Sequence, residues 1–511
     1  MTRHLAAAFS AAIVLTSQSA AQSDLTRDLD EIFNDAIFAR ATIGVRVESL
    51  ATGQVLYQRD AERLVMPASN MKVLTMAAAA ARLGWDFQYE TPLEAAGELR
   101  DGTLHGDLIV TGAGDPTIGS GDAGPSALFL EWADALLKAG IRRVNGRIIG
   151  DDNAFDDQAY GAGWAWDYLN AGYAAPSGAL SYDENVAVVR VRPGPAEGAP
   201  ASVEISPSGH TFEIRNEATT GAAGSSSTAA VVRTMGSRIL VVRGRVPAGG
   251  NGTSRTTTIE NPTGVFVETL RLTLASRGVA VSGGAADIDD VVEPPTGARR
   301  PIAVRRSVPL SALAGRFMKS SQNFYGEMLM KTVGRRANNV GTDENGRRAV
   351  RDTLVSWGIP AEAFVVYDGS GLSRYNYVSA STMVALFRKI WEDESLRGPF
   401  LALLPIGGRD GTLGSRMKQP PLFGRVQAKT GTIANVRALS GYLTTESGEK
   451  LVFSMIANDF TVSSGRVDEL VERALARLVS GLASNPSTRR VAARSGSAPS
   501  DSESGSRGAN F

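Results

Sequence analysis

A serine and a lysine three residues apart, placed at the start of a long apolar run, constrain this chain more than any other feature. Pro67 suits the start of a helix, Ser69 falls in its first turn, and Lys72 follows three residues later. Both side chains therefore share one face at the positively polarised end of the helix. The run from Val73 to Leu83 predicts that this helix is long. A hydroxyl with an amine in reach of its proton is the layout of an activated nucleophile.

The Ser-x-x-Lys pattern is weak on its own, because it also occurs at Ser415–Lys418 and Ser447–Lys450. Gln419-Pro420-Pro421 follows the first of these and stops any helix, and the second lies in a polar turn. Only Ser69–Lys72 precedes a long helix. Taken alone, that motif is also compatible with a helical turn that simply packs into a core.

The amino-acid composition excludes several kinds of catalytic site and ligand. The 511 residues include no cysteine, which excludes disulfides, thiolate catalysis and cysteine metal sites. The 53 basic residues balance 53 acidic ones and both signs are mixed, which argues against nucleic acid as a partner. The three histidines, His4, His105 and His210, lie in no recognisable catalytic context. A serine enzyme with this composition would use lysine as its base, and we expect neither a metal nor a cofactor.

The two ends of the chain differ from the rest. Residues 1–21 combine a basic start, an apolar run from Leu5 to Leu15 and the small residues Ser19-Ala20-Ala21, which predicts a secretory signal peptide. We therefore expect an exported protein with a periplasmic location and no transmembrane segment. Residues 485–511 are rich in Ser, Gly, Ala and Arg, which predicts disorder.

Between the ends, the patterns predict alternating helices and strands. Residues 42–50 and 54–57 form a hairpin, residues 309–334 are helical throughout, and residues 185–258 form a small β unit. The stretch from Asp468 to Ala483 is an amphipathic helix whose apolar stripe favours packing on a sheet. Peripheral attachment to a membrane or to the cell wall is the alternative that remains open.

Two further motifs follow the first one in order. Ser321-Gln322-Asn323 lies in the predicted helical stretch, and Lys429-Thr430-Gly431 lies among late strands. Ser-x-x-Lys, Ser-x-Asn and Lys-Thr-Gly in this order closely resemble the signature of penicillin-binding proteins and β-lactamases. The first interval is more than twice the second, and a compact β-lactamase has no room for it. The chain therefore resembles the low-molecular-mass penicillin-binding proteins of the D-alanyl-D-alanine carboxypeptidase/endopeptidase family that carry large insertions.

Further stretches strengthen the resemblance, which covers essentially the whole mature chain. They are Gly112-Ala113-Gly114-Asp115-Pro116, Gly163-Trp164-Ala165-Trp166-Asp167, Ala179-Leu180-Ser181-Tyr182-Asp183-Glu184-Asn185, Asp368-Gly369-Ser370-Gly371-Leu372-Ser373-Arg374 and Gly411-Thr412-Leu413.

The resemblance implies an α+β fold in which a penicillin-binding/β-lactamase-like transpeptidase domain, an antiparallel sheet flanked by helices, carries two nested insertions. We expect residues 22–92 and 304–484 to form the transpeptidase-like domain. An inserted α/β domain would comprise 93–184 and 259–303, and a mainly β domain, 185–258, would be nested within it.

The resemblance also implies acyl transfer at the terminal D-Ala-D-Ala bond of peptidoglycan stem peptides. Ser69 would attack the carbonyl carbon, and Lys72 would accept its proton after burial and the nearby Lys429 had lowered the lysine pKa. Ser321 would relay a proton to the leaving amine, and Asn323 would hydrogen-bond the substrate amide.

The remaining motif residues would bind substrate. Lys429 and Thr430 suit the terminal carboxylate, Gly431 allows close backbone approach, and Thr432 continues the edge strand. The backbone N–H groups of Ser69 and Thr432 would form the oxyanion hole. Asp167 is a candidate contact for a diaminopimelate amino group, with a structural role as the alternative.

The resemblance implies β-lactam antibiotics as a second class of ligand that acylates Ser69. A β-lactamase or serine esterase with the same Ser–Lys pair is an alternative, distinguished by rapid turnover of the penicilloyl adduct. A binding protein that has lost catalysis is another, distinguished by the absence of any adduct.

Overall fold

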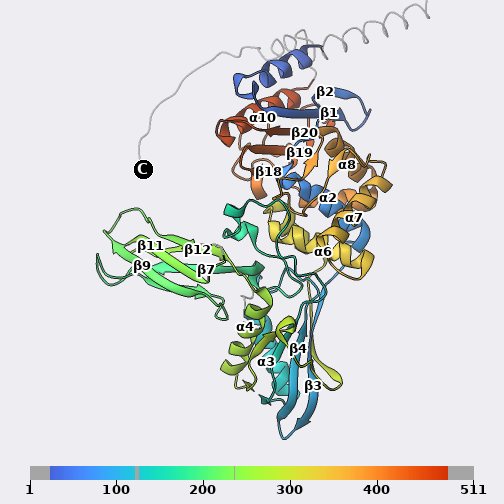
Figure 1. The fold of residues 1–511 in the computed structure, drawn as a ribbon. Coiled ribbons are helices and arrows are strands. Elements are labelled where there is room, and N and C mark those ends of the chain that lie inside the picture. The colour runs from blue at the N-terminus through green and yellow to red at the C-terminus, as the bar shows by residue number, and fades with distance from the viewer. Residues whose placement is uncertain (1–22, 121–125, 235, 482–511) are drawn as a thin grey trace, which may run out of the picture.

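The computed structural model describes residues 23–120, 126–234 and 236–481. The predicted signal peptide and C-terminal tail lie outside these residues. Figure 1 shows an upper lobe that contains both the first and the last described elements, a lower lobe with α3, α4, β3 and β4, and an arm of strands that projects from between them. Along the chain, the elements of the lower lobe and the arm lie between α2 (Met71–Leu83) and α5 (Leu310–Lys319) of the upper lobe.

The upper lobe is built on a five-stranded antiparallel sheet with the order β18-β19-β20-β1-β2. β1 pairs along its whole length with β20, so the first and last strands of the sequence close one sheet. β18, which carries the Lys-Thr-Gly motif, forms one edge. The strands are β1 (Thr42–Ser49), β2 (Val55–Arg59), β18 (Val426–Ile433), β19 (Val436–Thr444) and β20 (Lys450–Asn458).

Helices cover both faces of this sheet. Alternate residues of a strand point to opposite faces, and β19 accordingly sends Tyr442 into one apolar core and Leu443 into the other. The first core contains α2 (Met71–Leu83), α5 (Leu310–Lys319), α6 (Asn323–Asn338), α7 (Asp343–Ser356), α8 (Ala380–Glu392) and α9 (Glu394–Leu403). The second contains the helix of residues 23–33 and α10 (Ser464–Val479). The expected antiparallel sheet flanked by helices is confirmed.

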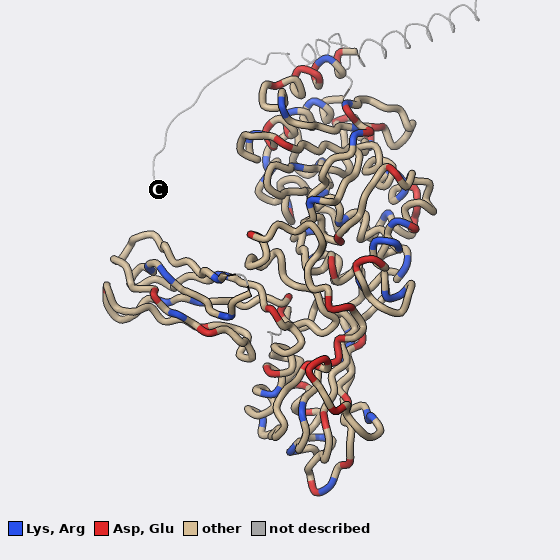
Figure 2. The backbone as a smooth tube through the Cα atoms, viewed as in Figure 1, with Lys and Arg blue, Asp and Glu red and all other residues tan. Residues whose placement is uncertain are grey.

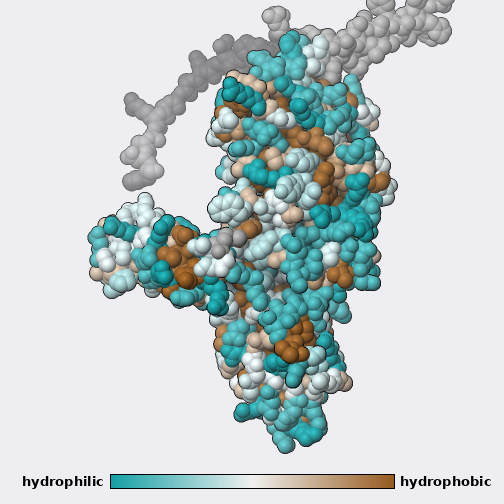
Figure 3. Space-filling view, in the orientation of Figure 1, coloured by the Kyte–Doolittle hydropathy of each residue, from teal (hydrophilic) through white to brown (hydrophobic). Residues whose placement is uncertain are grey.

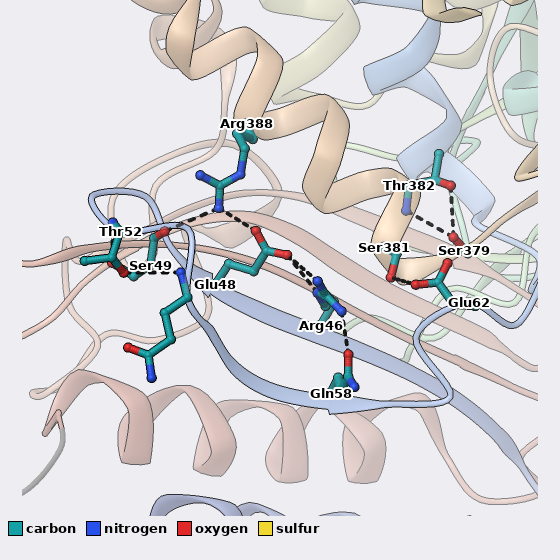
Figure 4. Close-up of polar contacts among 11 residues, drawn as sticks. Arg46, Glu48, Ser49, Thr52, Gln58, Glu62, Ser379, Ser381, Thr382 and Arg388 are labelled. Carbon is teal, nitrogen blue, oxygen red and sulfur yellow. Dashed lines mark hydrogen bonds and ion pairs between the residues drawn. The ribbon is translucent and has the colours of Figure 1, made fainter. Parts of the chain in front are cut away.

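Ion pairs fix α8 across the first hairpin, as Figure 4 shows. Glu48 of β1 accepts hydrogen bonds from Arg388 of α8 and from Arg46 of its own strand, with Arg46 Nη2 2.7 Å from Glu48 Oε1. Ser381 Oγ at the start of α8 donates to Glu62 Oε1 at 2.6 Å. These contacts tie α8 to β1 through Arg388 and, through Ser381, to the segment that leads into the nucleophile turn.

The lower lobe has its own core around a seven-stranded mixed sheet. Its strands are β3 (Glu90–Arg100), β4 (Thr103–Thr111), β5 (Arg143–Val144), β6 (Ile148–Asp151), β13 (Ala280–Val281), β14 (Ala285–Asp287) and β15 (Arg299–Arg306), and its helices are α3 (Ala127–Lys138) and α4 (Pro262–Ser276). Pairs of β3 with β15 extend from Ala96–Arg299 to Glu90–Arg306, so this antiparallel pair carries the chain into and out of the upper lobe.

The arm is the mainly β unit that the sequence predicts. Two three-stranded sheets enclose a small apolar core. One sheet contains β7 (Val186–Arg192), β8 (Ser202–Ser206) and β12 (Thr253–Thr258), and the other contains β9 (Glu213–Gly221), β10 (Ala230–Arg233) and β11 (Ile239–Pro247). A two-stranded sheet, β16 (Phe364–Val365) with β17 (Tyr377–Val378), completes the described strands. The predicted domain limits within the chain stay a prediction.

The prediction of one helical stretch from residue 309 to residue 334 is wrong in one respect. The stretch is broken into α5 and α6, and Ser321 lies in the break with a φ of 60°. The apolar periodicity of the two helices runs on across the break, so it gave no signal for the turn.

The surface of the described residues is mixed. Basic and acidic residues alternate over both lobes and the arm (Figure 2), and the face in Figure 3 is largely hydrophilic with small apolar patches. Among the residues described, none of the helices combines the length and the apolar character needed to span a bilayer.

The packing of α10 on the sheet generates a stability prediction. Leu470 is fully buried in the second core, so Leu470→Ala should lower the free energy of unfolding by about 2–5 kcal/mol, the usual cost of a core cavity. Leu64→Ala is the matched control, since Leu64 is 41% exposed and its truncation should change stability by less than about 0.5 kcal/mol. Urea denaturation of both variants measures the difference, and equal midpoints would contradict the assigned packing.

Candidate active site

The turn that carries Ser69 is held by close backbone contacts. Ser69 lies in the 3-10 helix η2 (Ala68–Asn70) directly before α2, and Ala68 has a φ of 46°. A Cβ atom at Gly371 would lie 1.9 Å from the carbonyl oxygen of Ala68, and one at Gly431 would lie 2.6 Å from that of Pro67. Only glycines allow two neighbouring segments to pack this closely on the backbone beside the serine. Gly431 therefore serves the nucleophile turn, in addition to any approach by substrate.

Lys72 is the second residue of α2, three residues after Ser69, and its side chain is fully buried. Its Nζ is 2.9 Å from Ser69 Oγ, 2.6 Å from Asn323 Oδ1 and 2.7 Å from the carbonyl oxygen of Ser370. A neutral amine donates two hydrogen bonds and accepts one. Asn323 and Ser370 can only accept, so a neutral Lys72 is left to accept the proton of Ser69.

Burial lowers the pKa of Lys72 to about 7, although the charges of Asp368 and Glu327 act to raise it. The predicted effect of burial on this pKa is confirmed. The predicted effect of Lys429 is not seen there. Repulsion between the two amines instead affects Lys429, whose pKa burial and then the charge of Lys72 lower well below its usual range. Near neutral pH, a large fraction of Lys72 is therefore unprotonated.

The second and third motifs meet on the opposite side of the nucleophile. Lys429 Nζ on β18 donates to Ser321 Oγ at 2.7 Å and to the carbonyl oxygen of Thr430 at 3.0 Å. The amide of Asn70 donates to the carbonyl oxygen of Lys429 at 3.1 Å, which ties β18 to the nucleophile turn. Thr430 Oγ1 lies 2.7 Å from Thr412 Oγ1. The three motifs thus form one connected hydrogen-bond network.

A cavity of about 500 Å³ opens at this network. Ser69, Ser321, Asn323, Thr430 and Thr432 line it, while Lys72 and Lys429 are buried behind the two serines to which they are bonded. The cavity's other walls are Tyr168, Tyr173, Gly371, Leu372, Thr412, Ile433, Ala434 and Ser464. The arrangement presents a nucleophile, a base and a second hydroxyl–amine pair to one ligand, which suits acyl transfer.

Two predicted substrate contacts differ from expectation in their surroundings. Asn323 accepts from Lys72 through Oδ1 and donates through Nδ2 to the carbonyl oxygen of Tyr173 at 2.8 Å, so both ends of its amide already have partners. Asp167 is exposed in the 3-10 helix η3 (Trp166–Tyr168) and does not line the cavity, although the next residue, Tyr168, does.

Three carboxylates elsewhere lie close enough to hold a cation. Oxygens of Asp152, Asp287 and Asp289 lie within 4.8 Å of one another in the lower lobe, which is the one such grouping among the described residues. Burial and the charge of Asp152 raise the pKa of Asp287 to about 6. None of the three lines the cavity at Ser69.

Comparison with known proteins decides the family. A model of the D-Ala-D-Ala carboxypeptidase 3 (S13) family matches residues 25–480. This chain belongs to that family. It is accordingly a serine-type D-Ala-D-Ala carboxypeptidase.

Individual relatives agree with this assignment. The chain is 35% identical over 454 residues to the D-alanyl-D-alanine carboxypeptidase of Actinomadura sp. (strain R39), which covers 85% of this chain and 81% of the relative. It is 28% identical over 461 residues to the D-alanyl-D-alanine carboxypeptidase DacB of Haemophilus influenzae, covering 88% and 90%. The crystal structure of penicillin binding protein 4 (dacB) from H. influenzae matches with a TM-score of 0.76 at 25% identity, covering 91% of this chain and 99% of that one. The recognised family and fold class are confirmed.

Sequence reasoning missed the support behind the family's motif residues. The loop that contains Ser370 is held by Glu327, whose two carboxylate oxygens accept from the N–H groups of Gly369 at 3.0 Å and of Ser370 at 2.9 Å. Asp368 in the same loop accepts from Trp164 Nε1 at 2.9 Å. The stretch around Ser370 contributes to the family resemblance. Its contact with Lys72 is made by a backbone carbonyl oxygen, which every residue has, so the sequence could not identify that contact.

The lowered pKa of Lys72 generates a pH prediction. The base must be neutral to accept a proton, so kcat/KM for release of D-Ala should rise with pH through an apparent pKa of about 7. Steady-state assays from pH 5 to pH 9 measure this profile. Asp287→Asn is the control, because its carboxyl titrates near pH 6 in another lobe and its removal should leave the profile unchanged. A profile flat across neutrality would contradict the assignment of Lys72 as base.

Proposed function

We propose that Ser69 forms an acyl-enzyme with the penultimate D-Ala of peptidoglycan stem peptides. The single observation that carries this proposal is the buried Lys72 amine, 2.9 Å from Ser69 Oγ, at the wall of the cavity to which all three motifs contribute. Family membership supplies the D-Ala-D-Ala bond as the target.

In acylation, neutral Lys72 removes the proton from Ser69 Oγ, which bonds to the carbonyl carbon. The N–H groups of Ser69 and Thr432 hold the oxyanion, each worth on the order of 3 kcal/mol. When the intermediate collapses, the C–N bond breaks and the amine of D-Ala takes a proton from Ser321 Oγ, which in turn takes up the proton that Lys72 accepted, so Lys72 is neutral again. Lys429 Nζ, 2.7 Å from Ser321 Oγ, holds this hydroxyl in place. Water then attacks the ester and gives one proton to Lys72, which passes it to Ser69 Oγ as the ester C–O bond breaks.

Substrate binding uses the same wall. Thr430 and Thr432 place hydroxyls in the cavity, and a terminal carboxylate bound there would favour the protonated form of Lys429 behind them. β18 is an edge strand, and residues 405–407 hydrogen-bond to its first part at Val426 and Ala428. Pairing with an extended peptide is therefore proposed for the part of the strand from Lys429 onward. Asp167 directly precedes Tyr168 of the cavity wall, and we propose it as a contact for the free amine of a diaminopimelate side chain. Both uncrosslinked ends and crosslinks present this acyl-D-Ala group, so we propose carboxypeptidase and endopeptidase activities at one site.

We propose that β-lactams acylate the same serine. Penicillin binding protein 4 of H. influenzae, at 24% identity and a TM-score of 0.72, has been crystallised with a β-lactam, and a β-lactam ring offers the same acyl carbon to a Ser–Lys pair. Export through the predicted signal peptide would bring the enzyme to its peptidoglycan substrate, with peripheral association to membrane or wall at most.

Mass spectrometry tests the acyl-enzyme. Penicillin should add its mass to the wild type and persist, while Ser69→Ala should show no adduct. Ser415→Ala, which removes the serine of a second Ser-x-x-Lys sequence, should acylate like the wild type. Rapid loss of the adduct would favour a β-lactamase or esterase, and no wild-type adduct would favour a protein without catalysis.

Replacing the base gives a second test. Lys72→Ala should slow acylation by at least about a hundredfold, the usual size of general-base catalysis, with penicillin binding before acylation retained. Stopped-flow fluorescence with a labelled penicillin measures both steps, and purified muropeptides show which bonds the wild type cuts. Near wild-type acylation by Lys72→Ala would refute the proposed role.

A further inference from the structure

We infer that Glu184, a residue of the inserted part of the chain, is a positioning residue for acylation, and this rests on the proposed roles of Ser321 and Asn323. Its carboxylate accepts a hydrogen bond from Arg316 Nε through one oxygen and from Gln322 Nε2 through the other. Arg316 belongs to α5, and Gln322 caps α6. One carboxylate therefore bridges the two sides of the turn that carries Ser321.

The turn needs such a bridge. Ser321 has a φ of 60°, in a region that is unfavourable for a non-glycine residue unless its surroundings hold it there. The interruption between α5 and α6 also removes helical hydrogen bonds that would otherwise fix the serine. Ser321 Oγ must nevertheless meet Lys429 Nζ, from which it lies 2.7 Å.

The position of Glu184 is fixed by a turn of three residues with positive φ, and hydrogen bonds of Asn185 hold that turn. Asp183, Glu184 and Asn185 have φ angles of 49°, 57° and 56°, three consecutive left-handed residues. Asn185 fixes them, because its Nδ2 donates to the carbonyl oxygen of Pro176 at 2.8 Å and its Oδ1 accepts from the N–H of Tyr182 at 3.1 Å. The side chain of Glu184 is only 7% exposed, while its partner Arg316 is 49% exposed. Strain combined with burial of a charged group indicates a selected geometry.

The same inserted segment holds the other half of the motif. The carbonyl oxygen of Tyr173, in the 3-10 helix η4 (Gly172–Ala174), accepts from Asn323 Nδ2 at 2.8 Å, which leaves Oδ1 directed at Lys72. Figure 1 shows this part of the chain beside the start of α6. Both catalytic-motif residues, Ser321 and Asn323, are thus held from the inserted part rather than from within the upper lobe alone.

Substitution of Glu184 tests the inference. Glu184→Ala should lower kcat for D-Ala release by about tenfold to a hundredfold, the cost of a slightly misplaced catalytic group, and change KM less than about twofold. Gln322→Ala, which leaves the Glu184–Arg316 pair intact, should lower kcat less, by about threefold to tenfold. Glu204→Ala is the control, since Glu204 is an exposed residue of the arm paired with Arg192 at 3.6 Å, and it should behave like the wild type.

A reciprocal exchange separates positioning from stability. The double variant Glu184→Gln/Gln322→Glu restores a hydrogen bond between the two positions with donor and acceptor exchanged. It should therefore recover part of the kcat that Glu184→Gln alone or Gln322→Glu alone loses. All rates are normalised to sites that penicillin titrates, and melting temperatures are measured alongside. Wild-type kcat in both Glu184→Ala and Gln322→Ala, with Ser321→Ala inactive, would overturn the inference alone. Activity in Ser321→Ala would instead overturn the proposed roles on which it rests.

Discussion

The burial of the Lys72 amine is the constraint on which the rest of the site depends. A charged ammonium is costly to bury without a counterion in contact, and the hydrogen-bond partners of Lys72 among the described residues are a hydroxyl, an amide oxygen and a backbone carbonyl oxygen. Burial therefore favours the neutral amine, whereas the charges of Asp368 and Glu327 oppose the shift. The balance leaves the pKa near neutrality, which is where a general base is most effective.

Several elements position the oxygen atoms that accept hydrogen bonds from that amine and the groups next to them. α2 carries the base, Glu327 on α6 fixes the loop of Ser370, and β18 carries Lys429, which contacts Ser321 in the turn between α5 and α6. These groups come from segments far apart in sequence, and the pairing of β1 with β20 joins the first and last of these segments in one sheet.

The sequence predicted the parts that depend on residue identity. Motif order gave Ser69, Lys72, Ser321, Asn323 and Lys429, all of which converge, and apolar alternation gave the hairpin and the packing face of α10. Their catalytic roles stay predictions. The sequence could not predict contacts made by backbone atoms, such as the hydrogen bond from Lys72 to the carbonyl oxygen of Ser370. The break at Ser321 was missed because helical periodicity continues on both sides of it.

Backbone with positive φ occurs at the nucleophile turn and at Ser321, and each of these positions needs support from neighbouring segments. Ala68, Ser321 and Glu184 all have left-handed backbone, and each such residue persists only where its surroundings over-determine it. For Ala68 the surroundings are Gly371 and the buried helix α2, both within the upper lobe. For Ser321 we propose that they include Glu184, which accepts a hydrogen bond from the neighbouring Gln322, while the carbonyl oxygen of Tyr173 accepts one from Asn323. Both contacts come from residues between α2 and α5 in the chain, so this part of the chain supports the second motif from outside the helices that carry it.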